Sequence, residues 1–242
     1  EGNGGSDGAD HSRAPHADLS EKGPCLTMES FGQSTGFLLY RTQVEGPLEG
    51  ELALGQVKDR VQVILDGEVL GISGRSTKTG AVSVKIPAGS HQLDLLVENM
   101  GRINYGSFMH GERKGLEGPL KLDEKELGPF EHVCLPMQET PAAGWQEIQD
   151  GDKPGKLTFL KARFKIGKPV DTFLDLGGFG RGIVWLNGHN LGRYWKAGPP
   201  GTVFAPGCWM KADAENEIVI LELESDKVPM TLPTRDKAVW LR

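Results

Sequence analysis

The chain has 242 residues, and glycine with proline makes up about a fifth of them, against roughly 12% in average proteins. A net charge of −6 offers no attraction for phosphates, so a nucleic-acid partner is not expected. No apolar run approaches the roughly 18 residues that a membrane span needs. Cys25, Cys134 and Cys208 lack zinc-binding spacing, and neither a metal nor another cofactor is expected.

The N-terminal segment, residues 1–24, is predicted to be a flexible linker. Glu1 to Asp10 contains four glycines and no large apolar residue, so it cannot bury enough surface to offset the entropy of ordering. Because the chain begins at Glu1 instead of Met, we expect a processed or partial chain, in which any signal peptide would not be visible. The cellular location and the redox state of the cysteines stay open.

Beyond the linker, short apolar runs separated by glycine and proline predict β-strands. The gaps between them leave little room for the helices of a βαβ fold, so antiparallel sheets in a sandwich or jelly roll are expected. The runs are Gly36–Tyr40, Arg60–Leu65, Ala81–Ile86 and Leu93–Val97 in the first half, and Leu157–Ile166, Thr172–Leu176, Gly182–Leu186, Val203–Phe204 and Glu217–Glu224 in the second.

An internal repeat predicts two copies of one β unit. Arg60–Gly71 recurs as Arg181–Gly192 at an offset of 121, with six of twelve positions identical. Flanking matches pair Phe37–Arg41 with Phe159–Arg163 at 122, and Leu93–Glu98 with Val219–Glu224 at 126. With the joint expected between 120 and 150, we divide the chain into β-sandwich domains at 25–130 and 131–242.

The repeated unit contains a hairpin turn that is readable from its residues. Asp66-Gly67 and Asn187-Gly188 are typical of type I′ turns, in which both central residues have positive φ. Ile64 on the face opposite Val63 is also apolar, as is the corresponding Trp185. These strands are therefore predicted to be covered on both faces, or to face a neighbouring domain.

No residue can be assigned a catalytic role from its motif. The acids are too many for a glycosidase pair to be chosen, and Glu222 with Glu224 is interpreted as the outer face of an edge strand. Gly177–Gly182 is rich in glycine, but it precedes a strand, whereas a phosphate-binding loop precedes a helix. It is interpreted as a tight turn between strands.

The candidate binding residues lie where the two copies differ. After its last strand, copy one continues through Glu98–Gly106, whereas copy two ends at Glu224-Ser225 with nothing comparable. Arg102, Asn104 and Tyr105 could hydrogen-bond to a sugar or stack on it, or dock on a partner. The alternative is a structural Ω-loop whose polar side chains satisfy backbone groups.

Four aromatic residues of copy two, Trp185, Tyr194, Trp195 and Trp209, are close in sequence. Such residues form sugar-binding platforms, but they also fill sandwich cores and domain interfaces. The core or interface interpretation is favoured.

These residues resemble the glycoside hydrolase family 35 β-galactosidases, of lysosomal and bacterial type, over about residues 26–225. The segments that carry the resemblance are Gly36–Thr42, Asp59–Gly67, Leu93–Gly106, Asp171–Leu174, Trp185–Gly188, Asn190–Trp195 and Asn216–Glu224. Val97–Arg102 and Asn190–Trp195 are the most specific of them.

The resemblance implies two tandem β domains of jelly-roll or galactose-binding-like type, without the TIM barrel that carries the family's two catalytic glutamates. It implies that the domains brace that barrel, in the same chain or another, and that Tyr105 borders its galactose pocket, with Arg102 and Asn104 supporting the loop. The parent enzyme would hydrolyse terminal β-galactosides with retention, and whether this chain counts as an enzyme stays uncertain. A free-standing galactoside-binding module resembling a lectin, and a pure interaction scaffold, are the alternatives.

Overall fold

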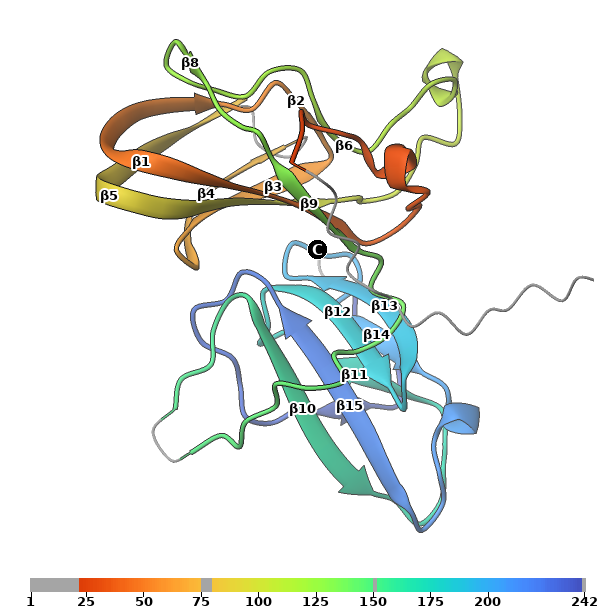
Figure 1. Ribbon diagram of the computed structural model, residues 1–242. Helices are drawn as coiled ribbons and strands as arrows, with labels where there is room; N and C mark the ends of the chain where they lie inside the picture. The colour runs from red at the N-terminus through yellow and green to blue at the C-terminus, as the bar shows by residue number, and fades with distance from the viewer. Residues whose placement is uncertain (1–21, 75–79, 150–151, 241–242) are drawn as a thin grey trace, which may run out of the picture. The chain divides into compact units, whose positions relative to one another are not determined.

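The computed structural model describes residues 22–74, 80–149 and 152–240, so most of the predicted linker lies outside the described residues. The chain divides between Met137 and Gln138 into two compact units. Both are built almost entirely from antiparallel strands, which confirms the all-β prediction (Figure 1). Among the described residues, no helix is long and apolar enough to cross a membrane.

The first unit contains nine strands and two short 3-10 helices among its described residues. They are η1 Met28–Phe31, β1 Phe37–Ala53, β2 Gln56–Lys58, β3 Arg60–Leu65, β4 Glu68–Gly74, β5 Ala81–Glu98, η2 Ser107–Met109, β6 Gly115–Glu117, β7 Lys121–Leu122, β8 Lys125–Glu126 and β9 Glu131–Leu135. The main sheet has the order β4-β3-β5-β1-β7-β8, with β9 also pairing β1, and β2 pairs β6 separately. The residues of β9, assigned from sequence to the second domain, thus pair within the first unit.

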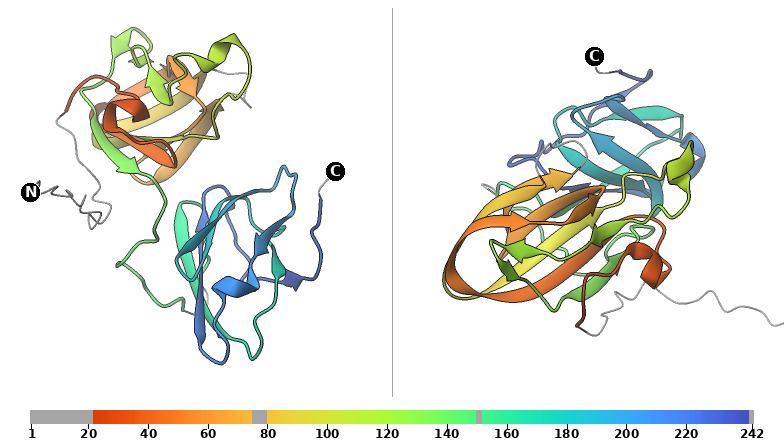
Figure 2. Two further views of the ribbon diagram at one scale, coloured as in Figure 1. Left: turned by 90° about the vertical axis from the view of Figure 1, so that its right-hand side faces the viewer. Right: turned by 90° about the horizontal axis from the view of Figure 1, so that it is seen from above.

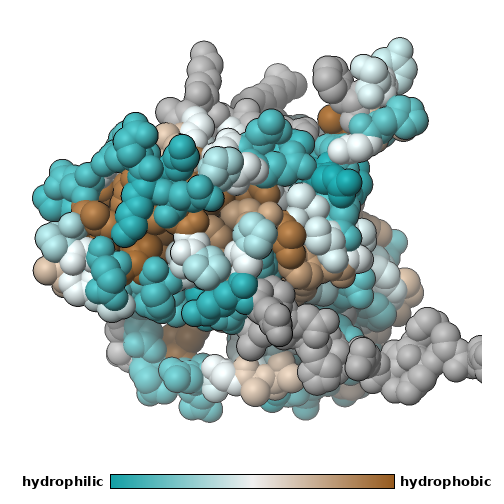
Figure 3. Space-filling view, turned by 45° about the horizontal axis from the view of Figure 1, so that its top comes forward, coloured by the Kyte–Doolittle hydropathy of each residue, from teal (hydrophilic) through white to brown (hydrophobic). Residues whose placement is uncertain are grey.

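The architecture of this unit depends on its two longest strands. β1 and β5 pair along nearly their whole length, and the ribbon they form curls back on itself (Figure 1). β9 pairs with Phe37–Arg41 at the start of β1, and β7 pairs with the end of β1. The curled ribbon encloses a core of buried aliphatic side chains, which includes Leu38, Val63 and Leu95. Polar side chains cover most of the face of the molecule seen in Figure 3, with apolar side chains between them.

The second unit is a sandwich of two sheets. Its elements are β10 Thr158–Lys165, β11 Thr172–Asp175, β12 Arg181–Leu186, β13 His189–Trp195, β14 Thr202–Ala205, η3 Gly207–Trp209, β15 Glu215–Glu222 and β16 Thr234–Arg235. One sheet has the order β10-β15-β12-β13 and the other β14-β11-β16. Figure 2 shows the strands of this unit in green to blue. Val184 and Ile220 of the first sheet belong to the same buried core as Leu174 and Val203 of the second, so the two sheets face each other.

The structure confirms the repeat and its hairpin. The order β4-β3-β5-β1 in the first unit matches β13-β12-β15-β10 in the second. Asp66 and Gly67 have φ of 47° and 88°, and Asn187 and Gly188 have 49° and 82°, as type I′ turns require. Both hairpins also carry a register shift at the same place, after Val63 and Val184. All residues of β3 and β12 are buried, as predicted for strands covered on both faces.

The register corrects the flanking matches. Leu65 lies opposite Leu93, and its counterpart Leu186 lies opposite Ile218. Leu93 therefore corresponds to Ile218, one residue earlier than the sequence match with Val219, and a shift of one residue moves a side chain to the other face of the sheet. Apolar residues occupy both faces of β15, so composition alone could not fix the register.

Candidate functional site

The candidate site is the loop that follows β5 in the first unit. The chain leaves the sheet after Glu98, passes through η2 and returns at β6. Tyr105 stands at its tip with 88% of its surface exposed, and the neighbouring Asn104 is exposed too. Within the described part of the chain, neither side chain hydrogen-bonds to the protein, so both remain available for a ligand or a partner.

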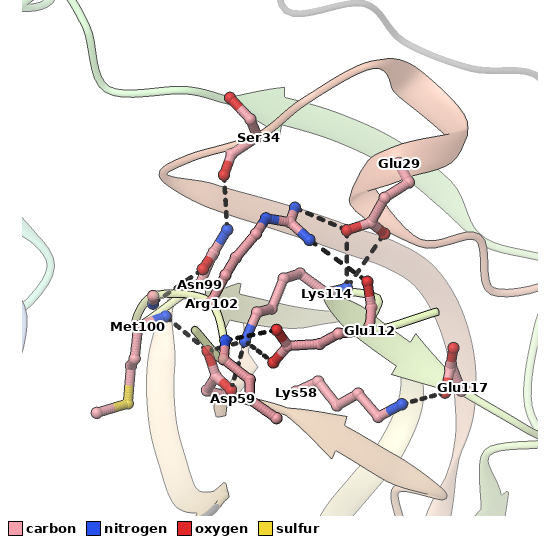
Figure 4. A network of polar contacts seen from close by, with 12 residues as sticks. Glu29, Ser34, Lys58, Asp59, Asn99, Met100, Arg102, Glu112, Lys114 and Glu117 are labelled. Atoms are coloured by element: carbon pink, nitrogen blue, oxygen red, sulfur yellow. Dashed lines mark hydrogen bonds and ion pairs between the residues drawn. The ribbon is translucent and has the colours of Figure 1, made fainter. Parts of the chain in front are cut away.

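Arg102 lies lower on the same loop and has a different environment. Its Nη2 atom is 2.7 Å from Oε1 of Glu29 on η1, and its Nη1 atom is 3.5 Å from the carbonyl oxygen of Glu112 (Figure 4). The backbone N–H of Ile103 donates to Oε2 of Glu112 at 2.7 Å. The two arms of the loop are therefore joined directly below the tip.

Asn99 and Asp59 fix the point where the loop leaves the sheet. Asn99 is buried; its side-chain amide donates to the carbonyl of Ser34, and its side-chain oxygen accepts from the N–H of Gly101. Asp59, between β2 and β3, accepts the N–H of Met100 at 2.8 Å. The loop thus begins from a backbone that is held on both sides (Figure 4).

A buried lysine completes the base of the loop. Lys114 is fully buried, and its ammonium lies 2.9 Å from both carboxylate oxygens of Asp59 and 2.8 Å from Oε1 of Glu112. Removing one partner from such a buried cluster leaves uncompensated charge, at a typical cost of about 3–5 kcal/mol. The base is therefore rigid, in contrast to the exposed tip.

Glu29 is the acid that reaches both arms of the loop. Its two carboxylate oxygens accept the N–H of Lys114 at 3.1 Å, in addition to the bond with Arg102. Burial alone would raise the pKa of Glu29, but hydrogen bonds from the backbone of Lys114, from its own backbone and from Arg102 together hold that pKa below its usual value. Glu29 is therefore ionised at neutral pH, which the bond to Arg102 requires.

The chemistry available at the tip is binding. The phenol ring of Tyr105 can stack on the apolar face of a sugar, and its hydroxyl and the amide of Asn104 can hydrogen-bond to sugar hydroxyls. Residues 22–74, 80–149 and 152–240 contain no group of three or more metal-ligating side chains. Of the predicted residues, Asn104 and Tyr105 lie at the tip, whereas Arg102 lies in the base.

The interpretation of Glu222 as an outward-facing residue of an edge strand is wrong. β15 is a central strand, and Glu222 is fully buried on its core-facing side. Its carboxylate accepts the N–H groups of Gly180, Arg181, Glu224 and Ser225, and the hydroxyl of Tyr194. Burial, with this carboxylate nearby, raises the pKa of Tyr194. The segment Gly177–Gly182 contains the turn between β11 and β12, as predicted, and its last two residues begin β12. Glu222 binds the N–H groups at the end of this turn.

The aromatic residues of the second unit form no single platform. Trp185 and Tyr194 are buried, as the core interpretation requires. Trp195 lies against the guanidinium of Arg181, which is 4.2 Å from the ring centroid. Trp209 is partly exposed and stacks on His189 with ring centroids 4.5 Å apart.

Sequence reasoning missed the acids and the lysine at the base of the loop. Glu29, Asp59, Glu112 and Lys114 are distant in sequence from one another or embedded among other charges, and no motif distinguishes them. The one available signal was the loop itself, because a long polar insertion in one copy of a repeat needs anchoring residues elsewhere.

Two family models match the chain, each on one unit. "Beta-galactosidase, first all-beta domain" matches residues 25–136, and "Beta-galactosidase, galactose-binding domain" matches residues 157–216. The chain belongs to the β-galactosidase family. The matched domains are non-catalytic β-galactosidase domains, and the exposed loop of Tyr105 lies in the first of them.

Individual β-galactosidases agree with this assignment. The β-galactosidase of Xanthomonas manihotis is 43% identical over 179 residues, which are 73% of this chain and 29% of that protein. Human β-galactosidase-1-like protein 2 is 36% identical over 79% of this chain and 30% of its own length. The bovine β-galactosidase is 36% identical over 82% of this chain and 34% of its own length. The chain thus spans about a third of the length of the curated relatives it matches.

Proposed function

We propose that this chain is the non-catalytic β region of a longer β-galactosidase that hydrolyses terminal β-galactosides, and that its first unit borders the galactose pocket. The observation that carries the proposal is the match of both units to β-galactosidase domains within a chain that spans only about a third of its relatives. In this proposal the two catalytic carboxylates of a retaining mechanism lie on a separate barrel domain. The β units brace that barrel.

The proposed role of Tyr105 is contact with the sugar, without proton transfer. The side chain of Tyr105 is 88% exposed, and the base of its loop is rigid. A side chain in this position is available for contact with a surface outside this chain. The loop belongs to one copy of the repeat only, so the shared scaffold does not require it. Asn104 adds an amide beside the ring, and Arg102 supports the loop from below.

The test compares Tyr105 variants in the complete enzyme. Tyr105→Ala is expected to lower kcat/KM by the equivalent of about 1–3 kcal/mol, the scale of one aromatic or polar contact, whereas Tyr105→Phe should be mild. Phe204→Ala, which removes another exposed ring on β14, is the matched control and should leave kcat/KM unchanged. In the isolated chain, Tyr105→Ala should leave the melting temperature nearly the same.

Two results would count against this proposal. Hydrolysis of a chromogenic galactoside by the isolated chain at ordinary enzymatic rates, on the order of 1–10³ per second, would show that catalysis does not need a barrel. Unchanged parent kinetics with Tyr105→Ala, together with a lower melting temperature of the isolated chain, would show that the loop is structural.

A second candidate function is galactoside binding without hydrolysis, as in a lectin. It is supported by the match of residues 157–216 to a galactose-binding domain and by the partly exposed Trp209. Calorimetric titration of the isolated chain with galactose separates the two candidates. Saturable binding that Trp209→Ala abolishes would favour the second.

A further inference from the structure

The segment that enters the first unit contacts the loop of Tyr105 at several points, and at one of them an acidic side chain makes the contact. Glu29 lies on η1. Met28, the first residue of η1, is fully buried, and its N–H donates a hydrogen bond to the carbonyl of Lys114. The N–H of Gln33 in turn donates to the carbonyl of Met28. Glu29 is therefore attached to a fixed part of the unit that does not itself belong to the loop.

From this position Glu29 holds both arms of the loop at once. Its bond to Arg102 fixes the outgoing arm, three residues before Tyr105, and its bonds to the N–H of Lys114 fix the returning arm. Two further bonds join the arms to each other, from the N–H of Ile103 to the carboxylate of Glu112 and from Nη1 of Arg102 to the carbonyl of Glu112. The bond between Glu29 and Arg102 therefore fixes the direction of the outgoing arm relative to η1.

Because the ion pair between Glu29 and Arg102 is partly exposed, we expect it to affect the position of the loop more than the stability of the unit. The side chains of Arg102 and Glu29 are 36% and 25% exposed, and ion pairs at such sites contribute little to stability. The fully buried cluster of Lys114 lies below them and holds the base of the loop whether or not Glu29 is present. Loss of the pair is thus expected to tilt the tip without unfolding the unit.

We infer that Glu29 is a positioning residue, which acts through Arg102 to aim Tyr105 at the galactoside. The inference rests on the proposed function, because a direction for the loop matters only if Tyr105 contacts the substrate. It adds a residue that no motif identified, and it connects the segment at the start of the first unit with the loop of Tyr105 through the bond of Glu29 to Arg102 that Figure 4 draws.

The chain offers a closely matched control. Glu117 on β6 pairs with Lys58 at 2.7 Å, with side-chain exposures of 30% and 26%, and this pair makes no bond to the tip. Glu29→Ala and Glu117→Ala each remove one partly exposed ion pair from the same unit, and Glu29→Ala also removes the acceptor of the N–H of Lys114. Only the first is expected to affect the loop.

The experiment is a double-mutant cycle in the complete β-galactosidase. Glu29→Ala is expected to lower kcat/KM about tenfold, because displacement of a positioned group by about 1 Å can cost up to 10²-fold. Glu117→Ala should have no effect. In a Tyr105→Ala background, Glu29→Ala should cause no further loss, since the group that it positions is absent. Glu29→Gln, which keeps an acceptor for Lys114 and Arg102, should restore part of the rate.

Hydrogen exchange on the 242-residue chain gives a readout that is independent of activity. Glu29→Ala should speed exchange of the amides of Ile103 and Lys114, and its melting temperature should fall below that of Glu117→Ala only by the effect of losing the one hydrogen-bond acceptor of the N–H of Lys114. Normal kcat/KM with Glu29→Ala, while Tyr105→Ala is impaired, would overturn this inference and leave the proposed function standing. An additive loss in the double variant would overturn it as well. If Tyr105→Ala has no effect, the proposed function fails first.

Discussion

The two copies of the hairpin close against the next strand in the same way. In the first unit Asp66 accepts the N–H of Gln92 through its side chain and donates its own N–H to the carbonyl of Gln92. In the second unit Asn187 makes both bonds with Glu217. The second side-chain atom then contacts the residue before: His91 at 2.6 Å from Asp66, and Asn216 at 2.8 Å from Asn187. One copy uses a carboxylate and an imidazole where the other uses two amides.

The copies differ most at the exit of the central strand. Val97 and Glu222 occupy equivalent positions, opposite Val61 and Gly182. In the first unit an apolar side chain enters the core, and the chain beyond continues into the loop of Tyr105. In the second unit the carboxylate of Glu222 accepts hydrogen bonds from backbone N–H groups and fixes the chain at the end of β15. The scaffold is thus kept in both copies, and only one of them leaves this end free for another role.

The largest effect on stability is expected from Glu222→Val, which gives the end of β15 the residue type that Val97 provides at the equivalent position of β5. Glu222→Val removes the acceptor of four buried or partly buried N–H groups and should lower the free energy of unfolding of the second unit by about 3–5 kcal/mol. Denaturant unfolding followed by tryptophan fluorescence measures this loss. Glu215→Val, at the exposed start of the same strand, should stay within about 0.5 kcal/mol. Equal stability of the two variants would contradict this role of Glu222.

A smaller and symmetric effect is expected at the turns. Gly67→Val and Gly188→Val place a β-branched residue at φ of 88° and 82°, where no neighbouring atom lies within 4 Å of a new Cβ. Backbone strain alone should then cost about 1–3 kcal/mol in each unit. Gly167→Val, at a glycine without positive φ, is the control. Thermal melts that differ widely between the two turn variants would show that the copies are less equivalent than their registers indicate.

The smallest effect should come from the pair of Asp66 and His91 in the first copy. A hydrogen bond from His91 lowers the pKa of Asp66, and the same bond raises the pKa of His91. The contribution of Asp66 is present above its unfolded pKa, near 3.8, and is lost as pH falls through the lowered value. That of His91 is present below its unfolded pKa, near 6.5, and is lost as pH rises through the raised value.

Asp66→Asn tests this pair with the residue that the second copy already uses. Asparagine preserves the turn and the bond to the N–H of Gln92, so only the ionic part is lost. The melting temperature of the wild-type chain should exceed that of the variant most between about pH 4 and 6.5, and the difference should shrink at higher pH. A difference that persists at pH 9 would show that the ionic interaction is not its source.

The fold could be predicted because local rules and the repeat agree. Asp66-Gly67 and Asn187-Gly188 specify type I′ turns by themselves, and the apolar runs on either side have few other solutions. The register of β15 could not be predicted, since Ile218, Val219 and Ile220 are all apolar and match equally well in either phase. The face of Glu222 could not be predicted either, because no pattern in the sequence distinguishes a buried carboxylate from one on an outer face.

The site could be predicted only in part. The loop of Tyr105 was visible as an insertion in one copy, but its anchors were not, because Glu29 and Lys114 meet through tertiary contacts across 85 residues. Charged residues that end up buried have no sequence signature, since their cost is offset only by partners that the fold brings together.

The pairing of β9 with β1 has a consequence for synthesis on the ribosome. Phe37 lies opposite Leu135, so β1 is synthesised nearly a hundred residues before its partner strand β9. At usual rates of translation this delay is about 5–20 s. Meanwhile one edge of β1 offers unpaired N–H and C=O groups to any extended segment nearby. Nascent or truncated chains that end before Glu131 should therefore associate with one another or require a chaperone, whereas chains extending past Leu135 should not.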